Sequence, residues 1–160
     1  MKPLERVVSL TEAADRVRRL KRLGKTVVFT NGVFDLLHPG HVRFLEQARA
    51  LGDFLVVGVN TDASVRRLKG PGRPVFPLEA RLIMLNALRS VDLIVPFEED
   101  TPRRLIETLL PQVLVKGADY RREEVVGHDI VEHHGGRVVL LPLLPGYSTS
   151  KIIERIRKLP

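Results

Sequence analysis

The sequence predicts an α/β fold: a Rossmann-like, doubly wound parallel sheet of five strands. Short apolar runs rich in β-branched residues alternate along the 160 residues with segments whose apolar positions recur at helical spacing, an order typical of βα units. The run from Phe54 to Val59 is apolar without a break, which favours a strand covered on both faces. Loops rich in glycine and proline indicate where the segments end.

In the first half of the chain, an apolar stripe over residues 9–23 predicts an amphipathic helix. Residues 1–24 are therefore assigned to an N-terminal helical extension and residues 25–160 to the core of a single 1–160 domain. The β-branched and aromatic run within 25–30 predicts the first strand, and helical spacing predicts a helix from Gly40 to Leu51. After the strand at 54–59 come a Gly/Pro-rich loop at 69–74 and a helix at 78–88, which Pro77 can begin.

The second half repeats this alternation. Thr101 as N-cap and Pro102 as first helical residue begin a helix that Pro111 ends. Ser148 is expected to cap the last helix, whose apolar face carries three isoleucines between 152 and 156. The remaining elements are strands at 91–95, 113–115 and 138–141 and a helix at 122–134, which Gly135 and Gly136 end.

Composition and charge exclude several classes of protein. The chain has no cysteine, which excludes disulfides, thiolate nucleophiles and cysteine-bound metals. No apolar run approaches the length of a membrane span and no signal segment opens the sequence, so a cytoplasmic protein without membrane contact is expected. The net charge of +7 invites a nucleic-acid partner, but the basic residues are scattered and aromatic residues make up only 5%, too few for a base-stacking platform. No nucleic-acid partner is expected.

Two histidines three residues apart, His38 and His41, lie where the first strand gives way to a helix. The backbone N–H groups at a helix N-terminus lack intrahelical partners and the helix dipole is positive there, so this position binds anions. Two imidazole N–H donors beside it suit a phosphate whose charge grows during a reaction. Solvated histidines or a simple cap are the usual alternative for an isolated His-x-x-His, but the preceding strand, Gly40 and the following helix favour the anion site.

The other polar segments of interest fall at the carboxyl ends of predicted strands. In an open parallel sheet, ligands bind outside these ends, where the strand order reverses, so the segments are expected to converge on one crevice. The chain contains neither G-x-G-x-x-G nor a Walker lysine loop, which excludes the dinucleotide-binding and P-loop variants of the fold. The segments are Thr30 to His41, Asn60 to Lys69, Lys116 to Tyr120 and Gly146 to Ser150.

The segment His38-Pro39-Gly40-His41, preceded by Asn31-Gly32-Val33-Phe34-Asp35, resembles the HxGH signature of the nucleotidylyltransferases. Residues 59–70, 73–81, 114–120 and 145–150 are similar to the branch of that superfamily that makes ADP-heptose. The resemblance implies that residues 25–160 are a catalytic core that transfers AMP from ATP to D-glycero-β-D-manno-heptose 1-phosphate, giving ADP-heptose and pyrophosphate.

Two other functions stay open. The second hypothesis is a CTP-dependent cytidylyltransferase for glycerol 3-phosphate or a similar alcohol phosphate. Related cytidylyltransferases carry an arginine where this chain has Leu143 and Leu144, which disfavours that hypothesis. The third is a nucleotide- or nucleic-acid-binding module without catalysis.

The resemblance also implies roles for individual residues. Several of them have simpler alternatives: Lys69 as a solvated loop cation, Asp35 as a turn cap, metal ligand or orienting partner of an imidazole, Arg81 in a surface salt bridge, and Ser148 as an ordinary helix cap. The implied catalytic residues are His38, His41 and Lys69; the nucleotide-binding residues are Thr30, Asn31, Gly32, Val33, Phe34, Gly40, Lys116, Gly117, Asp119, Tyr120, Ser148, Thr149 and Ser150; the substrate-binding residues are Asp35, Asn60 and Arg81.

The expected partners of the reaction are ATP, a sugar phosphate and Mg²⁺ carried with the nucleotide. Mg²⁺ would be held mostly by phosphate oxygens and water, so no protein metal site is expected. His128, His133 and His134 lack the paired spacing of a zinc site and are interpreted as solvated helix surface. The resemblance further implies a homodimer and, because the chain is too short to include a sugar kinase, a separate heptose kinase and phosphatase in the pathway.

Overall fold

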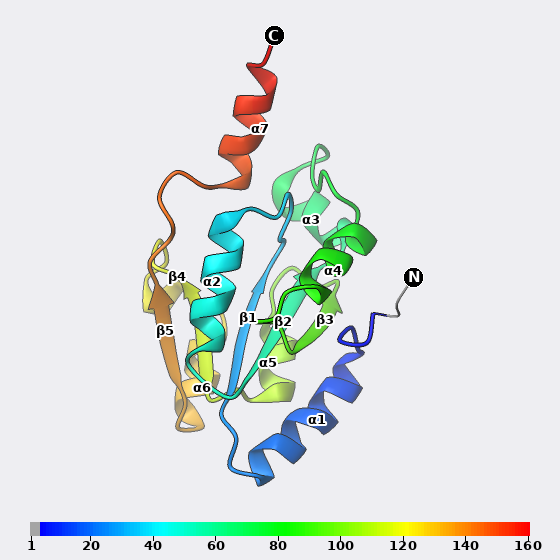
Figure 1. Ribbon diagram of the computed structural model, residues 1–160. Helices are drawn as coiled ribbons and strands as arrows, with labels where there is room; N and C mark the ends of the chain where they lie inside the picture. Colours follow the sequence, from blue (N-terminus) through cyan, green and yellow to red (C-terminus); the bar gives the residue numbers. More distant parts are fainter. Residues whose placement is uncertain (1–3) are drawn as a thin grey trace.

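The computed structural model describes residues 4–160 and contains one sheet of five parallel strands in the order β3–β2–β1–β4–β5 (Figure 1). This order confirms the predicted doubly wound, Rossmann-like sheet. The strands are β1 (Val27–Gly32), β2 (Phe54–Asn60), β3 (Leu93–Phe97), β4 (Val113–Gly117) and β5 (Arg137–Leu141). The helices are α1 (Leu10–Arg22), α2 (Pro39–Arg49), α3 (Asp62–Lys69), α4 (Leu78–Asn86), α5 (Arg103–Leu109), η1 (Arg122–Glu124), α6 (His128–His133) and α7 (Thr149–Arg157).

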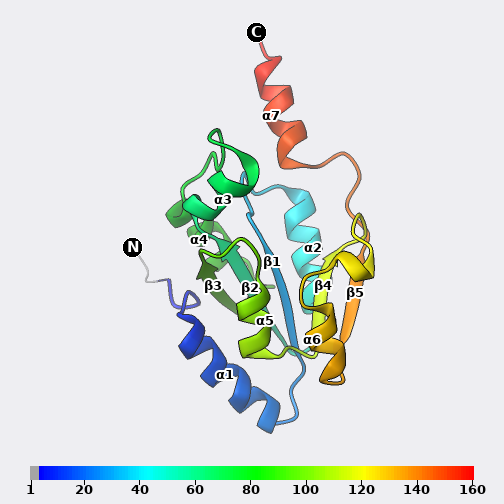
Figure 2. The ribbon, with the colours of Figure 1, turned by 180° about the vertical axis from the view of Figure 1, so that it is seen from behind.

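Side chains that alternate along the buried strands divide the core between the two faces of the sheet. In β1, Val27 and Phe29 pack in the cluster that contains buried residues of α1, α5 and α6, whereas Val28 packs in the cluster that contains those of α2 and α4. The two views agree with this division: α2 covers one face and α5 with α6 the other (Figures 1 and 2). A strand buried on both sides must be apolar at successive positions, which is the pattern of the sequence.

The strand order reverses beside β1. The chain runs from β1 to β2 and β3 on one side and then crosses to β4 and β5 on the other, so the carboxyl ends of β1 and β4 form the switch point of the sheet. Helix α7 follows β5 and projects beyond this end of the sheet, where none of its residues is buried (Figure 1).

Some local predictions are wrong. Lys69, predicted on a loop, is the last residue of α3, a helix that begins after Thr61, whose hydroxyl accepts from the backbone N–H of Ser64 at 3.4 Å. Thr101 does not cap α5, because that helix begins only at Arg103 after Pro102 and has no side-chain cap. The helix predicted at 122–134 is divided into η1 and α6 by the segment 125–127.

The predicted N-terminal extension is present as α1, which Ser9 caps with its side chain. Three buried residues of α1, Ala13, Ala14 and Val17, pack against the sheet. The first three residues of the predicted extension lie outside the described part of the chain. None of the helices of residues 4–160 is long and apolar enough to cross a membrane.

Arg81, on α4, is fully buried and connects the carboxyl ends of β1 and β2. Its Nη1 donates to the carbonyl oxygens of Val33 at 2.7 Å and Asn60 at 2.8 Å, its Nη2 to the Asp62 carboxylate at 2.8 Å, and its Nε to the carbonyl oxygen of Phe76 at 3.1 Å. The sequence predicts a substrate contact or a surface salt bridge for Arg81. The structure contradicts the substrate contact, because the guanidinium is enclosed; Arg81 does form a salt bridge, with Asp62, but from a buried position.

Arg81→Met is expected to destabilise the fold by about 3–5 kcal/mol, because it leaves buried carbonyl groups and a carboxylate without their donor. Urea denaturation measures this change in the free energy of unfolding. Arg89→Met, an exposed arginine just beyond the end of the same helix, is the matched control and should change stability by less than about 0.5 kcal/mol. A loss at Arg81 no larger than the control's would show that its hydrogen bonds do not hold the strand ends together.

Candidate active site

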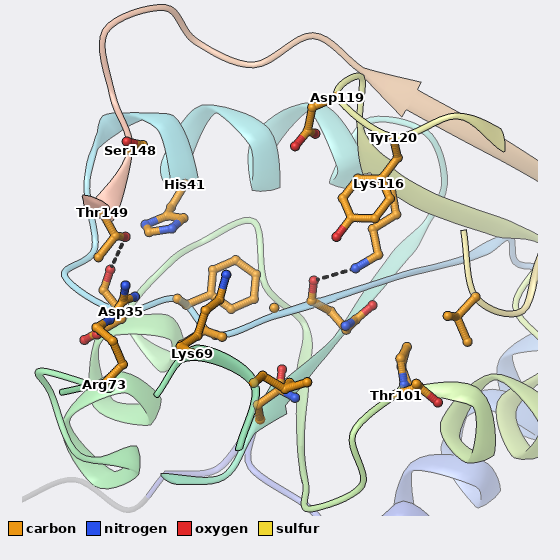
Figure 3. Close-up of a pocket in the computed structure, with 18 of the residues that line it drawn as sticks. Asp35, His41, Lys69, Arg73, Thr101, Lys116, Asp119, Tyr120, Ser148 and Thr149 are labelled. Atoms are coloured by element: carbon orange, nitrogen blue, oxygen red, sulfur yellow. Dashed lines mark hydrogen bonds and ion pairs between the residues drawn. The ribbon is translucent and has the colours of Figure 1, made fainter. Parts of the chain in front are cut away.

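A cavity of about 670 Å³ opens at the carboxyl ends of the strands. Segments far apart in the sequence form its wall, namely the ends of β1, β2 and β4 and the start of α7 (Figure 3). A smaller cavity of about 240 Å³ lies beside it, and the residues that line both cavities include Asn31, Phe34, His41 and Asp119. The predicted crevice therefore exists, and the histidine loop lies at the junction of its two parts.

The loop from Val33 to His38 delivers the first histidine to the N-terminus of α2. Phe34 and Leu36 adopt positive φ values of 53° and 50°, which side chains other than glycine rarely adopt. The buried Phe34 ring lies edge-on to His41 with ring centroids 5.5 Å apart. Strain of this kind persists where the surrounding packing fixes the backbone, and it occurs often at functional loops.

His38 and His41 cap α2 with their own rings. Nδ1 of His38 accepts from the backbone N–H of Gly40 at 3.1 Å, and Nδ1 of His41 accepts from the backbone N–H of His38 at 3.3 Å. The rings are stacked with centroids 3.7 Å apart. Because each Nδ1 is an acceptor, the proton of each neutral ring is on Nε2. Both histidines therefore keep an Nε2–H donor for a ligand while they cap the helix.

The surroundings of the two rings favour their neutral forms. Burial lowers the pKa of His38. Burial and, to a smaller extent, the adjacent His38 lower the pKa of His41 to about 4, although Asp35 opposes the shift. The pair therefore presents neutral donors near pH 7.

Gly40 is required by this arrangement. A Cβ atom at position 40 would lie 2.8 Å from Cε1 and 2.9 Å from Nδ1 of the His38 ring, closer than real contacts allow. The ring can fold back onto the start of α2 only because residue 40 has no side chain. Gly40 therefore has a local steric role, in addition to the nucleotide-binding role that the sequence predicts for it.

Asp35 is buried and binds the loop between α3 and α4. Its carboxylate accepts from Nε of Arg73 at 2.9 Å and from the backbone N–H groups of Val75 at 2.7 Å and Phe76 at 2.9 Å. Its carbonyl oxygen accepts from the Thr149 hydroxyl at 2.8 Å (Figure 3). Asp35 thus joins the histidine loop, the loop 70–77 and the start of α7.

These contacts also hold Asp35 in its ionised form. Burial alone would raise the pKa of its carboxyl, but the backbone donors of Phe76 and Val75 together with Arg73 outweigh it, so the pKa is lowered. Its carboxylate is turned to the loop rather than to a metal or an imidazole, the two other roles left open by the sequence. The substrate contact predicted for Asp35 would have to replace these hydrogen bonds.

Lys116, at the end of β4, brings a half-buried cation to the switch point. Its Nζ donates to the carbonyl oxygen of Asn31 at 3.3 Å and lies 5.6 Å from the centre of the Tyr120 ring. Burial lowers its pKa to about 8, and the carboxylate of Asp119 partly opposes that shift. The Asp119 carboxylate lies over Gly117, where a Cβ would be only 2.6 Å from Oδ1. Of the four residues predicted on this segment, Lys116, Asp119 and Tyr120 line the larger cavity, and Gly117 lines the smaller one.

Lys69 and the start of α7 complete the cationic side of the cavity. Lys69 extends from the end of α3 toward His41 (Figure 3). The Ser148 hydroxyl accepts from the backbone N–H of Lys151 at 3.1 Å, as predicted for the cap of α7, and Ser150 also lines the cavity.

Arg73, which was given no role from the sequence, lines the cavity too. The sequence feature that could have indicated a role for Arg73 is its position in a loop with the pattern Gly-x-Gly-Arg-Pro.

The structure does not bring every predicted residue to the cavity. Thr30 is fully buried inside the sheet, where its hydroxyl donates to the carbonyl oxygen of Val115 at 2.8 Å, and it is not part of the cavity wall. Arg81 lies behind the wall. Asn60 lines the cavity and its Nδ2 donates to the Ser64 hydroxyl at 3.0 Å. The wall includes Asp100 and Thr101, which the sequence analysis does not assign to a site.

The low pKa of His41 makes stability depend on pH. The unfolded chain, with a histidine pKa near 6.5, binds a proton that the folded protein excludes until about pH 4, so acid favours unfolding. Above pH 6.5 this proton lowers the free energy of unfolding little, and at pH 4.5 it lowers the free energy of unfolding by about 2 kcal/mol. Urea denaturation of wild type and His41→Asn at pH 6.5 and at pH 4.5 measures this change. The free energy of unfolding lost between the two pH values should be about 2 kcal/mol smaller in the variant. His133→Asn, on an exposed helix end, is the control and should follow wild type.

The model of the family described as cytidylyltransferase-like matches residues 29–155 of this chain. The bifunctional protein HldE of Syntrophotalea carbinolica is 60% identical over 136 residues, which are 85% of this chain and 28% of the relative. The bifunctional protein HldE of Alkalilimnicola ehrlichii is 54% identical over 154 residues, which are 96% of this chain and 32% of that relative. The chain thus spans about a third or less of the length of these curated relatives.

Among solved structures, the lipopolysaccharide core biosynthesis protein of Thermoplasma volcanium is similar in fold with a TM-score of 0.62. It is 30% identical, and the match covers 76% of this chain and 98% of that one. The family match includes the histidine loop, the cavity wall and most of α7. The chain belongs to the cytidylyltransferase-like family.

Proposed function

We propose that this protein is an adenylyltransferase that transfers AMP from ATP to a sugar 1-phosphate, D-glycero-β-D-manno-heptose 1-phosphate, with release of pyrophosphate. The observation that carries the proposal is the pair of neutral imidazoles at the N-terminus of α2. Each has its Nδ1 engaged and its Nε2–H left free, and both rings line the smaller cavity, which His41 shares with the larger one. Such donors suit the α-phosphate of a nucleotide.

The reaction needs alignment and charge stabilisation more than a base. An ionised phosphate oxygen of the acceptor attacks the α-phosphorus, a new P–O bond forms, and the bond to the β-phosphate oxygen breaks as pyrophosphate leaves. His38 and His41 donate hydrogen bonds to the α-phosphate as its charge grows. The start of α7, including Ser150, and the cations Lys69 and Arg73 attract the remaining phosphates.

The smaller cavity supports ATP over CTP. Its wall includes the apolar side chains of Phe44, Leu143, Leu144 and Tyr147 next to Gly117. These side chains offer stacking and apolar contact to a purine, and the arginine of related cytidylyltransferases is replaced by leucine here. We therefore assign the adenine and ribose to this cavity, with Asp119 as the acceptor for a hydroxyl or amino group.

Mg²⁺ would enter with ATP. Across residues 4–160, no group of three or more His, Asp or Glu side chains is arranged to hold a metal, and the Asp35 carboxylate is occupied by Arg73 and the loop backbone. Such a site fits an ion held by triphosphate oxygens and water. When bound, the ion would neutralise charge on the phosphates.

The acceptor and the cellular setting rest on the relatives. The resemblance of the HxGH segment and four other stretches to the ADP-heptose branch, together with a 30% identical lipopolysaccharide core biosynthesis protein, supports a heptose phosphate. The sugar 1-phosphate would be supplied in the cytoplasm by a separate kinase and phosphatase. Relatives about three times as long are called bifunctional, which is consistent with a second activity in the same pathway.

Pyrophosphate release tests the proposed reaction. Wild type should release pyrophosphate with ATP and heptose 1-phosphate, and much more slowly with CTP or with glycerol 3-phosphate. His38→Ala/His41→Ala should lose about a hundredfold or more in kcat, because the donors to the α-phosphate are removed. The matched control is His133→Ala/His134→Ala, an exposed adjacent pair that should keep the wild-type rate.

Three results would contradict this assignment in different ways. A preference for CTP would indicate the cytidylyltransferase. Salt-sensitive binding to oligonucleotides with no pyrophosphate release would indicate the non-catalytic module. A histidine double variant as active as its control would remove the imidazoles from the mechanism.

We also propose that the protein is a homodimer in which a second copy covers α7. Helix α7 projects from the body, and Ile156 and Leu159 at its end are 56% and 63% exposed (Figure 2). Exposed apolar side chains of this kind on a projecting helix are typical of a protein interface.

Sedimentation or light scattering tests the dimer. Wild type should have about twice the 18.0 kDa mass of one chain. Ile152→Glu/Ile156→Glu should be monomeric, because charges on the apolar face oppose its burial. The control Arg155→Gln/Arg157→Gln, on the same helix, should remain dimeric. A monomeric wild type at micromolar concentration, or a dimeric glutamate variant, would disprove this interface.

A further inference from the structure

The main cavity is not uniform in charge. One end contains the cations Lys69 and Arg73 beside the neutral His41, whereas Thr101 lies at the opposite end, with Lys116 between them (Figure 3). Two carboxylates near Thr101 are each paired with an arginine: Asp100 with Arg67 and Glu124 with Arg121, both at 2.9 Å. We call the part of the cavity formed by Asn31, Asp100, Thr101 and Glu124 the polar lobe.

Asn31 reaches the polar lobe from the end of β1. It follows Phe29 on the face of the sheet that α5 covers, and its partner in the register of β2 is Gly58. A Cβ at Gly58 would lie 3.3 Å from Cβ of Asn31 and 3.1 Å from the Leu105 side chain. Leu105, Phe29 and Asn31 therefore pack closely around position 58, and glycine there lets Asn31 lie beside β2 on this face. The segment Thr101–Pro102 leads into α5 on the same face.

The side-chain oxygen of Asn31 is buried, and within residues 4–160 no donor is bonded to it. Other polar groups near the switch point are satisfied: the backbone carbonyl of Asn31 accepts from Lys116, and Asn60 donates to Ser64. A buried acceptor without a donor is unfavourable by about 1–3 kcal/mol, so its retention next to a cavity points to a ligand that donates. An ionised phosphate cannot donate, whereas a sugar hydroxyl can.

We propose that the polar lobe binds the hydroxyl-bearing part of the sugar phosphate acceptor, and that Oδ1 of Asn31 accepts a hydrogen bond from one of its hydroxyl groups. This inference rests on the proposed transfer to a sugar phosphate and adds the residues that select the sugar. The acceptor phosphate lies between His41 and Lys116, and the sugar extends from there toward Thr101. A shorter alcohol phosphate would leave Asn31 Oδ1 without its donor, which disfavours that acceptor.

Steady-state kinetics of Asn31→Ala test the proposal. The KM for heptose 1-phosphate should rise about tenfold or more, because a site built to bond a hydroxyl loses its acceptor, while the KM for ATP changes less than about twofold. The slow reaction with glycerol 3-phosphate should be unaffected. Thr101→Val should raise the same KM, and Thr108→Val, an exposed threonine on α5, is its matched control. Thr101 is exposed, so this second pair tests the lobe even if Asn31→Ala fails to fold.

Nucleotide analogues test whether the ribose of ATP occupies the lobe instead. In that case 2′-deoxy-ATP or 3′-deoxy-ATP would be a poor substrate for wild type, Asn31→Ala would not discriminate against it, and the KM for ATP would rise. That outcome would overturn the proposal. An unchanged KM for the acceptor in both Asn31→Ala and Thr101→Val would also overturn it.

These outcomes are distinct from a failure of the proposed function. If wild type transfers AMP to no sugar phosphate, the reaction is wrong. Calorimetric binding of heptose 1-phosphate to wild type, Asn31→Ala and Thr101→Val would then test the lobe by itself. Weaker binding to both variants supports a hydroxyl-binding lobe, and equal binding to all three proteins rejects it.

Discussion

The buried carboxylate of Asp35 is the interaction on which the site depends. Its two oxygens receive three hydrogen bonds from residues 73–76, and its carbonyl receives one from Thr149. The segments that carry the histidines, the cation Arg73 and the start of α7 are therefore held by one residue. A charge placed inside a protein must be compensated fully, and here the compensating donors join the histidine loop to the loop 70–77, while the Asp35 carbonyl joins it to the start of α7.

The histidine pair combines two tasks that usually need different residues. A helix N-terminus needs acceptors for its first N–H groups, and each Nδ1 supplies one. That hydrogen bond also fixes the tautomer, so the same ring presents its other nitrogen as a donor. The low pKa of His41 follows from burial against Phe34 and its neighbour ring. On the proposed mechanism, the growing negative charge is therefore stabilised by oriented dipoles and by the cations of the site, not by an imidazolium.

The sequence was sufficient for the sheet, for the histidine loop and for the cap of α7, because these depend on local patterns and on strand periodicity. It was insufficient where contacts between distant parts of the chain determine the environment of a residue. Arg81 has the spacing of a surface residue on a helix, yet the carbonyl groups at two strand ends enclose it. Helix α3 has a recognisable cap in Thr61 followed by Asp62, but only eight residues before the loop. The buried oxygen of Asn31 has no sequence signature, because the packing of other strands and helices decides whether a donor reaches it.

The carboxyl end of β1 faces both parts of the cavity. Asn31 and Gly32 line the larger cavity and the smaller one alike. A strand at the switch point has neighbouring strands on both sides, so its end lies where the two parts of the cavity join. On the proposed assignment, the nucleotide base and the sugar occupy cavities that meet at this strand end, and their phosphates meet at the N-terminus of α2.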